Sequence, residues 1–336
     1  MKINMTNWAQ TIIEAKEVKC LPVLFFPCLP LAGKGVIEVV NDGQAQFQTM
    51  KTVIETFPDM IGAMTGMDLT SEAEAFGSVV RFKDTEAPTV TMELVTGRES
   101  AENLQVPSLD KGRAKVFLQA AELAAKHFTD RPTFGGMLGP FSLTAVLMGL
   151  EKTLKAPKKD PATLHILLNK CVQYSIKYAQ AFKAAGASGV LLAEPTAGLL
   201  SADWCDEYSS QYVKKIVDAV QDDEFFIVHH DCGRVTKLVN SMVSTGAKGY
   251  HFGNAVNMLD ILPQIPGNFL VFGNIDPSRV LHEGTPEKVK QAILTLLEQM
   301  KPYPNFVLSS GCDIPPGVPI ANLKAFFDAL AEFNQK

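Results

Sequence analysis

Arginine is scarce in this chain of 336 residues: it occurs six times, and never before position 81. Lysine and arginine together number 31 against 36 aspartates and glutamates, which gives a formal charge of −5. A mildly acidic protein lacks the basic surface that binding to nucleic acid or to an anionic membrane requires. We therefore expect neither nucleic acid nor a membrane as the main partner.

Long apolar runs are also missing. The longest, at 20–32, contains three prolines and is shorter than the roughly 20 residues that span a membrane. Near the N-terminus, Trp8 and Gln10 stand where a signal peptide would have its apolar stretch. The sequence therefore predicts a cytoplasmic protein. In that compartment six cysteines indicate metal binding or catalysis more than a disulfide framework.

Short apolar runs rich in β-forming residues alternate with longer amphipathic stretches along the chain. This alternation predicts an α/β fold with parallel strands joined by helices, and eight such units close into a (β/α)8 TIM barrel. One barrel accounts for the length, so we expect a single domain over 1–336 with an N-terminal helical extension. The runs expected as strands are 22–26, 59–63, 133–138, 189–193, 225–230, 249–252, 269–272 and 305–309.

Three segments between the runs allow further predictions. Residues 79–82 and 89–94 alternate apolar and polar side chains around a polar connection, which predicts a β-hairpin inserted at about 79–94. Residues 152–161 are charged and contain prolines, so we expect a surface loop there. Residues 164–185 carry apolar side chains at helical spacing and predict a long helix.

The segment 225–233, Phe-Phe-Ile-Val-His-His-Asp-Cys-Gly, joins a predicted strand to two metal-binding residue types. His230 and Cys232 lie two residues apart, so on an extended backbone their side chains point the same way. Cys312 follows another predicted strand, and the C-terminal ends of barrel strands share one rim. One imidazole and two thiolates form a three-ligand zinc site with an open fourth position, the catalytic arrangement. The alternative is that these side chains only pack inside the barrel.

The other histidine and cysteine residues near predicted strands are expected to have structural roles. His229 points to the opposite side from His230, which predicts packing outside the barrel. Four cysteines are expected to be structural, although Cys28 follows the first predicted strand and keeps a site role open. These four are Cys20, Cys28, Cys171 and Cys205.

Four polar residues also follow predicted strands and so belong to the expected rim. Glu194 is a candidate fourth zinc ligand or catalytic base, with helix capping as the alternative. We take Asn274 and Asp276 as candidate catalytic residues and Asn254 as a candidate cofactor-binding residue. Capping of a helix that begins at Pro277 is the alternative role for Asp276.

Three short segments resemble the uroporphyrinogen decarboxylase superfamily, and specifically its cobalamin-dependent methyltransferase branch. They are His-Asp-Cys-Gly at 230–233, Gly-Asn-Ile-Asp-Pro at 273–277 and Gly-Cys-Asp-Ile-Pro-Pro-Gly at 311–317. A further match lies at 67–77, and the similarity runs from about residue 5 to the C-terminus. The resemblance implies a (β/α)8 barrel and a zinc ion held by His230, Cys232 and Cys312.

The chain departs from the decarboxylases themselves in its N-terminal segment. Those enzymes resemble one another in an arginine-rich motif there, whereas 25–33, Phe-Phe-Pro-Cys-Leu-Pro-Leu-Ala-Gly, contains no arginine. A tetrapyrrole with eight carboxylates needs such cations. In addition, Glu74 aligns with the catalytic aspartate of the decarboxylases. We therefore do not expect decarboxylase activity.

The resemblance implies transfer of a methyl group from a methylated corrinoid, as methylcobalamin or on a corrinoid protein, to a thiol such as coenzyme M. The chain lacks the Asp-x-His-x-x-Gly motif of corrinoid-carrying domains, so we expect a separate corrinoid protein as partner. One alternative is transfer from a methoxy, methylamine or methylthio compound to a corrinoid protein. Another is a non-catalytic barrel that binds zinc or a corrinoid.

Overall fold

The computed structural model describes residues 2–336 and contains one sheet of eight parallel strands, in the order β1-β10-β9-β8-β7-β6-β5-β2. Cys20 and Met60 form a parallel bridge, and the Ile61 N–H donates to the Cys20 carbonyl at 3.1 Å. The two ends of the sheet therefore meet, which confirms the predicted TIM-like barrel. The strands are β1 (Lys19–Cys20), β2 (Ala63–Met64), β5 (Thr133–Leu138), β6 (Gly189–Ala193), β7 (Phe226–Asp231), β8 (Gly249–Phe252), β9 (Leu270–Ile275) and β10 (Phe306–Ser310).

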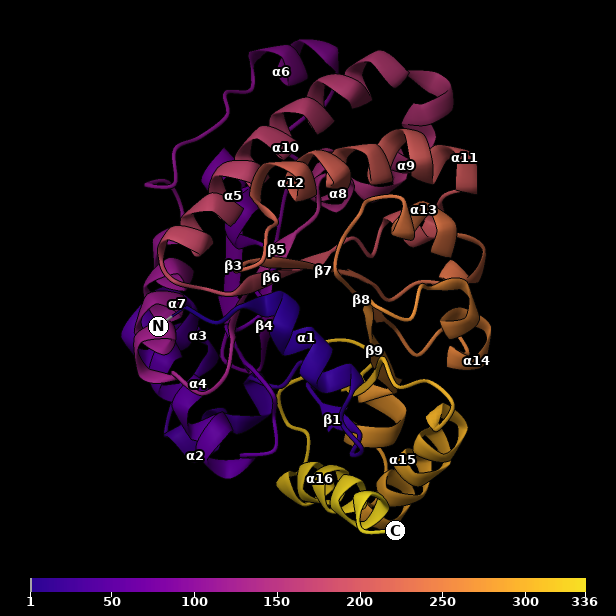
Figure 1. Ribbon diagram of the computed structural model, residues 1–336. Helices are drawn as coiled ribbons and strands as arrows, with labels where there is room; N and C mark the ends of the chain where they lie inside the picture. The colour runs from indigo at the N-terminus through magenta and orange to yellow at the C-terminus, as the bar shows by residue number, and fades with distance from the viewer. Residues whose placement is uncertain (1) are drawn as a thin grey trace.

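Helices surround these strands because each crossover to the next parallel strand runs along the outside of the barrel. The first half of the chain contributes α1 (Met5–Ile13), α2 (Leu29–Ala32), α3 (Val36–Asn41), α4 (Gly43–Thr56), α5 (Ser71–Phe76), α6 (Arg98–Asn103), α7 (Ala114–His127), α8 (Pro140–Met148) and α9 (Leu150–Lys159). The second half contributes α10 (Pro161–Ala184), α11 (Ala202–Cys205), α12 (Gln211–Val220), α13 (Val239–Val243), α14 (Met258–Ile261), α15 (Pro286–Met300) and α16 (Ile320–Asn334). In Figure 1, α10 and α12 lie on one side of the strands and α15 and α16 on the other. No helix within 2–336 combines the length and the apolar composition that crossing a bilayer would take.

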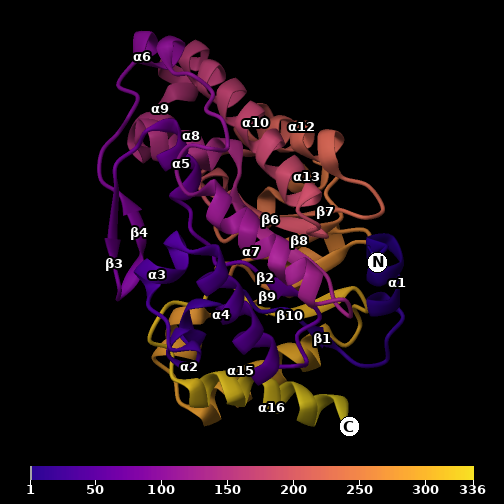
Figure 2. The same ribbon diagram turned by 90° about the vertical axis from the view of Figure 1, so that its left-hand side faces the viewer.

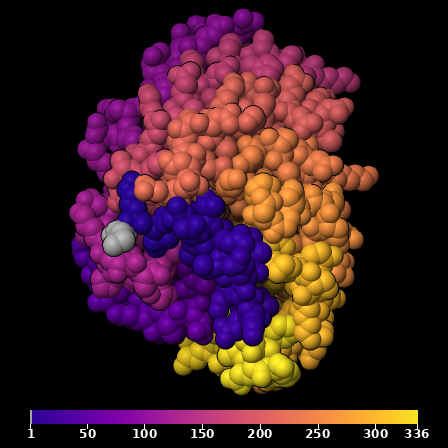
Figure 3. All heavy atoms as spheres, in the orientation of Figure 1, coloured from indigo at the N-terminus to yellow at the C-terminus, as the bar shows by residue number. Residues whose placement is uncertain are grey.

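The N-terminal helix α1 lies against the start of the barrel strands. The Trp8 ring lies 6.0 Å from the ring of Phe134, near the start of strand β5, and the Met5 N–H donates to the Asp223 carbonyl just before β7. Figure 3 shows this indigo segment over the centre of one face of the molecule. The predicted N-terminal extension therefore covers the end of the barrel opposite to the rim that carries the candidate site residues.

The first two strands differ from the prediction, whereas the other six match it to within three residues. The run at 22–26 is not a strand: β1 ends at Cys20 and irregular chain leads into a 3-10 turn at Phe26–Cys28. The backbone N–H groups of this run bond outside a sheet ladder: Leu24 donates to the Pro22 carbonyl at 2.8 Å and Val23 to the Ser310 hydroxyl at 3.0 Å. Strand β2 begins only at Ala63, where the prediction ended.

Residues 152–161, expected to form a loop, belong largely to helix α9. Thr153, Ala156 and Pro157 are buried, whereas the charged side chains of the helix are exposed. Spacing of i, i+3 and i+4 places the three buried residues on one helical face. Because these residues are small or polar, the amphipathic pattern is weak in the sequence. The expected long helix after it is confirmed as α10.

The predicted hairpin is present as the antiparallel strands β3 (Val80–Lys83) and β4 (Glu86–Val90). Figure 2 shows it at the edge of the molecule farthest from α1. A buried arginine, Arg113 at the start of α7, holds this region together. It forms ion pairs with Asp68 and Glu74, the latter at 2.7 Å, and donates to the Val40 carbonyl at 3.2 Å. Its guanidinium also lies 4.7 Å from the centre of the Phe82 ring in β3.

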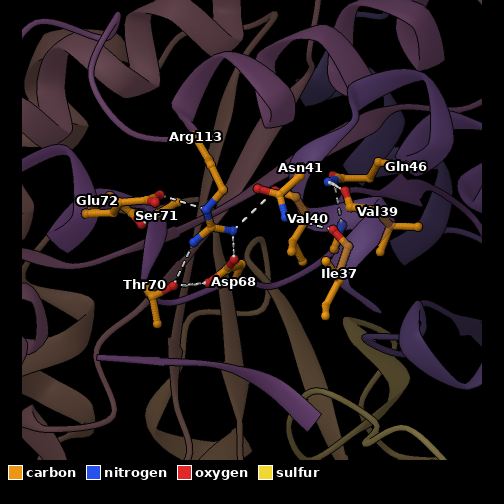
Figure 4. A network of polar contacts seen from close by, with 12 residues as sticks. Ile37, Val39, Val40, Asn41, Gln46, Asp68, Thr70, Ser71, Glu72 and Arg113 are labelled. Carbon is orange, nitrogen blue, oxygen red and sulfur yellow. Dashed lines mark hydrogen bonds and ion pairs between the residues drawn. The ribbon is translucent and has the colours of Figure 1, made fainter. Parts of the chain in front are cut away.

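Figure 4 shows the guanidinium of Arg113 directed toward Asp68 and Val40, which come from different βα segments. Each segment lacks a long apolar strand or helix of its own in this region. The ion pairs therefore fix the segments that follow β1 and β2, together with the hairpin, relative to α7.

We predict that Arg113→Met destabilises the protein by about 3–5 kcal/mol, because it leaves two carboxylates without their buried cation. Arg98→Met is the matched control, since Arg98 forms an exposed ion pair with Glu102 and should cost less than about 1 kcal/mol. The midpoints of chemical unfolding measure both. Equal losses for the two variants would show that the Arg113 network does not hold the fold.

Candidate metal centre

Strands β7 and β10 bring together the three predicted metal ligands. His230 lies in β7, Cys232 follows directly after that strand, and Cys312 lies two residues past the end of β10. The Nε2 atom of His230 is 3.7 Å from Sγ of Cys312, and the three ligand atoms all lie within 4.8 Å of one another. The predicted convergence of these side chains on the C-terminal rim is therefore confirmed.

The geometry of this group suits zinc. Zn–N and Zn–S bonds of about 2.1 and 2.3 Å at a tetrahedral angle place nitrogen and sulfur about 3.6 Å apart. The observed 3.7 Å between His230 and Cys312 matches this spacing. One imidazole with two thiolates is also a donor set that zinc takes in proteins. The residues present therefore fit a zinc ion with three protein ligands.

The two thiols of the group differ in acidity. A hydrogen bond from the Cys312 thiol stabilises the thiolate of Cys232 and lowers the pKa of Cys232. The same interaction raises the pKa of Cys312, because a second thiolate beside the first is repelled. The group therefore holds one thiolate readily, and a cation at its centre favours ionisation of both.

A residue missed in the sequence analysis, His251 in β8, contacts the candidate ligand His230 directly. His230 and His251 are paired in the β7–β8 register, and their Nδ1 atoms lie 2.7 Å apart. Both imidazoles are buried. The one available signal was that His251 occupies a predicted strand next in the chain to that of His230.

Glu194 lies at the end of β6, but its carboxylate is outside the group of three ligand atoms. Its oxygens accept the N–H groups of Phe141 and Ser142 at 2.9 and 2.8 Å, so Glu194 caps the start of α8. A Cβ on Gly139 would lie 2.2 Å from the Glu194 side chain, which requires glycine there. Complete burial outweighs these hydrogen bonds and raises the pKa of Glu194 to about 7.

The other three predicted site residues connect the loops that follow β8 and β9. Asn254 donates to one carboxylate oxygen of Asp276 at 2.9 Å, and the second oxygen accepts two N–H groups of the turn Pro277–His282. Asn274 donates to two carbonyls of the loop after β8, at 2.9 and 2.8 Å. A Cβ on Gly311 would lie 2.6 Å from the Asn254 nitrogen, so these loops also approach Cys312 closely.

The remaining cysteines and His229 lie outside the group. All four cysteines are buried, and burial raises the pKa of their thiols, to about 12 for Cys28, Cys171 and Cys205. His229 is buried within reach of the Met242 backbone in α13, and burial lowers its pKa to about 3. This position, against a helix on the outer side of β7, agrees with the prediction.

Comparison with known proteins places the chain in a family. The family model described as uroporphyrinogen decarboxylase (URO-D) matches residues 14–333. The chain belongs to the URO-D family. Among its relatives, the methylcobamide:CoM methyltransferase MtbA of Methanosarcina acetivorans is 30% identical over 87% of this chain and 86% of its own. MtbA of Methanosarcina mazei is 29% identical over 98% of this chain and 99% of its own.

A solved structure shares the fold of this URO-D family member over its whole length. It is a methyltransferase from Methanosarcina mazei, with a TM-score of 0.87 and 23% identity over 99% of both chains. The expected family resemblance and the barrel fold are therefore both confirmed.

We predict that Glu194→Gln changes how stability depends on pH. The folded-state pKa of Glu194, about 7, exceeds its ordinary value of 4.5, so the folded protein keeps a proton that the unfolded chain releases. The contribution of this residue to stability is therefore complete below about pH 4.5 and is lost as the pH rises to about 7. Over that range wild type should lose about 3 kcal/mol relative to the variant.

Chemical unfolding midpoints at a series of pH values test this prediction. The glutamine amide lowers the free energy of unfolding by an amount that does not depend on pH, because one backbone N–H loses its acceptor. The dependence of stability on pH can therefore still be compared with that of wild type. Glu298→Gln, at an exposed carboxylate, is the control and should keep the wild-type slope. A Glu194→Gln slope identical to that of wild type would contradict the raised pKa.

Proposed function

We propose that this URO-D family member is a zinc-dependent methyltransferase that moves a methyl group from a methylated corrinoid to a substrate thiol. The observation that carries the proposal is the His230–Cys232–Cys312 group, with its three ligand atoms within 4.8 Å. Three protein ligands leave a fourth tetrahedral position for the thiol. The activity named for the MtbA relatives, methylcobamide:CoM methyltransferase, supports this direction and coenzyme M as the thiol.

Each member of the group has a role in this reaction. Zinc at these ligands would supply the positive charge that keeps a substrate thiol deprotonated near neutral pH. Cys232 and Cys312 contribute two negative charges, which preserve the nucleophilicity of the substrate sulfur. The sulfur forms its bond to the methyl carbon as the cobalt–carbon bond breaks, and the electron pair of that bond stays on cobalt. Glu194, Asn274, Asp276 and Asn254 then act by shaping the rim around the substrates.

The position of Arg113 argues against decarboxylation of an acidic tetrapyrrole. This arginine is buried on the C-terminal side of β2, but its guanidinium is held by Asp68 and Glu74. It is therefore not available to bind substrate carboxylates. The segment 25–33, which has no arginine, offers no replacement. A corrinoid donor and a small thiol do not need such a cluster of cations.

The distribution of exposed apolar side chains supports docking of a separate corrinoid protein. Of the eight large apolar side chains exposed within the described residues, seven lie between the C-terminal end of a strand and the helix that returns to the next strand. An apolar surface at the rim suits a protein that must bring its corrinoid to the metal group. The seven are Leu31, Ile37, Leu69, Val79, Met92, Leu150 and Leu199.

We predict that the purified protein contains about one zinc ion per chain. Cys312→Ala should lose most of it, because two ligands remain. Cys205→Ala removes a buried cysteine outside the group and should keep the wild-type content. Plasma mass spectrometry measures all three proteins. Freshly purified wild type without zinc would refute the proposed site.

We also predict that the zinc-loaded protein demethylates methylcobalamin in the presence of a thiol from a panel that includes coenzyme M. The products are the methyl thioether and cob(I)alamin, detected by mass spectrometry and by the visible spectrum. In Cys312→Ala the rate should fall at least about 100-fold, since loss of a residue that only orients a metal ligand already costs about 10–100-fold. Transfer only from a methoxy, methylamine or methylthio donor to cob(I)alamin would reverse the proposed direction. If the zinc-loaded protein transfers no methyl group in either direction, the non-catalytic barrel that binds zinc or a corrinoid is the better description.

A further inference from the structure

The Nδ1 atom of His230 faces two atoms of His251 at hydrogen-bond distance. One is the His251 carbonyl oxygen, at 3.2 Å, and the other is the His251 Nδ1 atom, at 2.7 Å. A carbonyl oxygen only accepts, so the proton must be on Nδ1 of His230. In the neutral ring this leaves Nε2 of His230 unprotonated. Nε2 is the atom that lies 3.7 Å from Cys312 Sγ in the metal group.

The far side of His251 leads to the same assignment independently. Its Nε2 atom lies 2.9 Å from the Ser309 hydroxyl, and that hydroxyl donates to the Leu21 carbonyl at 2.7 Å. The hydroxyl has a single proton, and that proton is used in the hydrogen bond to the Leu21 carbonyl. Ser309 therefore accepts from Nε2–H of His251, and Nδ1 of His251 is left as the acceptor for His230. In this series of hydrogen bonds each group therefore donates to the next, from His230 through His251 and Ser309 to the Leu21 carbonyl.

The surroundings of His251 keep its ring neutral, as this assignment requires. The imidazole is 2% exposed and lies in the barrel interior, where its ring stacks on Phe272. No carboxylate lines the small space beside it, and an imidazolium there would have no counter-charge. The side chains that line this space with His251 are Leu21, Met64, Phe134, Leu191, Val228 and Phe272.

We propose that His251 and Ser309 are positioning residues that hold His230 in its Nδ1–H form and so present a bare Nε2 atom to the metal. The inference rests on the proposed zinc site. Strands β7, β8 and β10 each contribute one side chain, and the segment after β1 supplies the terminal carbonyl. Because Nε2 carries no proton, His230 binds the metal without first releasing one.

Two serines on β10 form a matched pair for the test. Ser309 belongs to the hydrogen-bonded chain, whereas the adjacent Ser310 accepts the Val23 N–H at 3.0 Å and takes no part in it. Both are fully buried. Loss of either hydroxyl leaves one buried N–H without a partner, so both alanine variants should unfold at lower denaturant concentration. Only Ser309→Ala should weaken zinc binding, by about 10-fold or more.

Zinc affinity is measured on the full-length metal-free protein by competition with a chromophoric chelator. Ring-15N NMR of the same protein reports which nitrogen of His230 carries the proton. We expect the Nδ1–H form in wild type and in Ser310→Ala, and a shift toward Nε2–H in Ser309→Ala. Wild-type zinc affinity in Ser309→Ala, or an Nε2–H form in the metal-free wild type, would overturn the proposal.

A second pair of variants covers the case in which Ser309→Ala does not fold. His251→Asn keeps an acceptor oxygen near the position of Nδ1, whereas His251→Leu, of similar size, has none. His251→Asn should bind zinc more tightly, and equal affinities would overturn the proposal. If wild type binds no zinc at all, the proposed function fails, while the NMR spectrum still decides the form of His230.

Discussion

The register of the parallel strands is the constraint on which the metal group depends. Side chains alternate between the two faces of a strand, so the register and phase of β7 direct His230 inward and His229 toward α13. A slip of one residue would exchange the two histidines and remove both His230 and Cys232 from the rim. The same register places His251 beside His230. His230 and its hydrogen-bond partner are therefore positioned together, by backbone pairing that extends around the barrel.

Buried polar groups hold the loops of the rim where apolar packing does not reach. Arg113 joins the segments after β1 and β2, and Glu194 holds the start of α8. Glu72 accepts the Leu138 N–H at 2.7 Å from the other side of the same turn, and burial raises the pKa of Glu72 to about 7. Such groups are costly to bury, but each is matched to a partner in one geometry. These groups give the rim a defined shape, although their burial lowers the free energy of unfolding.

Strands with continuous apolar runs could be predicted well, and short ones could not. Strands β5 and β6 have the expected bounds because their residues are buried on both faces. Strand β1 contains only Lys19 and Cys20, and two residues are too few to show the alternation of side chains that identifies a strand. Helix α9 was missed because its buried face contains Thr153 and Pro157 in place of large apolar side chains. Prediction failed where an element owes its conformation to neighbours far along the chain.

The sequence by itself determined the donor set of the candidate metal site: an imidazole and a thiol two residues apart on a strand, and a second thiol after another strand of the same barrel. Spacing along an extended backbone is a local property, so this part of the site was visible without a structure. Only the tertiary structure decided the roles of Glu194, which caps α8, and of His251 and Ser309, which adjoin His230. Their partners lie on other strands and loops, and a hydrogen bond between strands depends on register, which no spacing within one strand specifies.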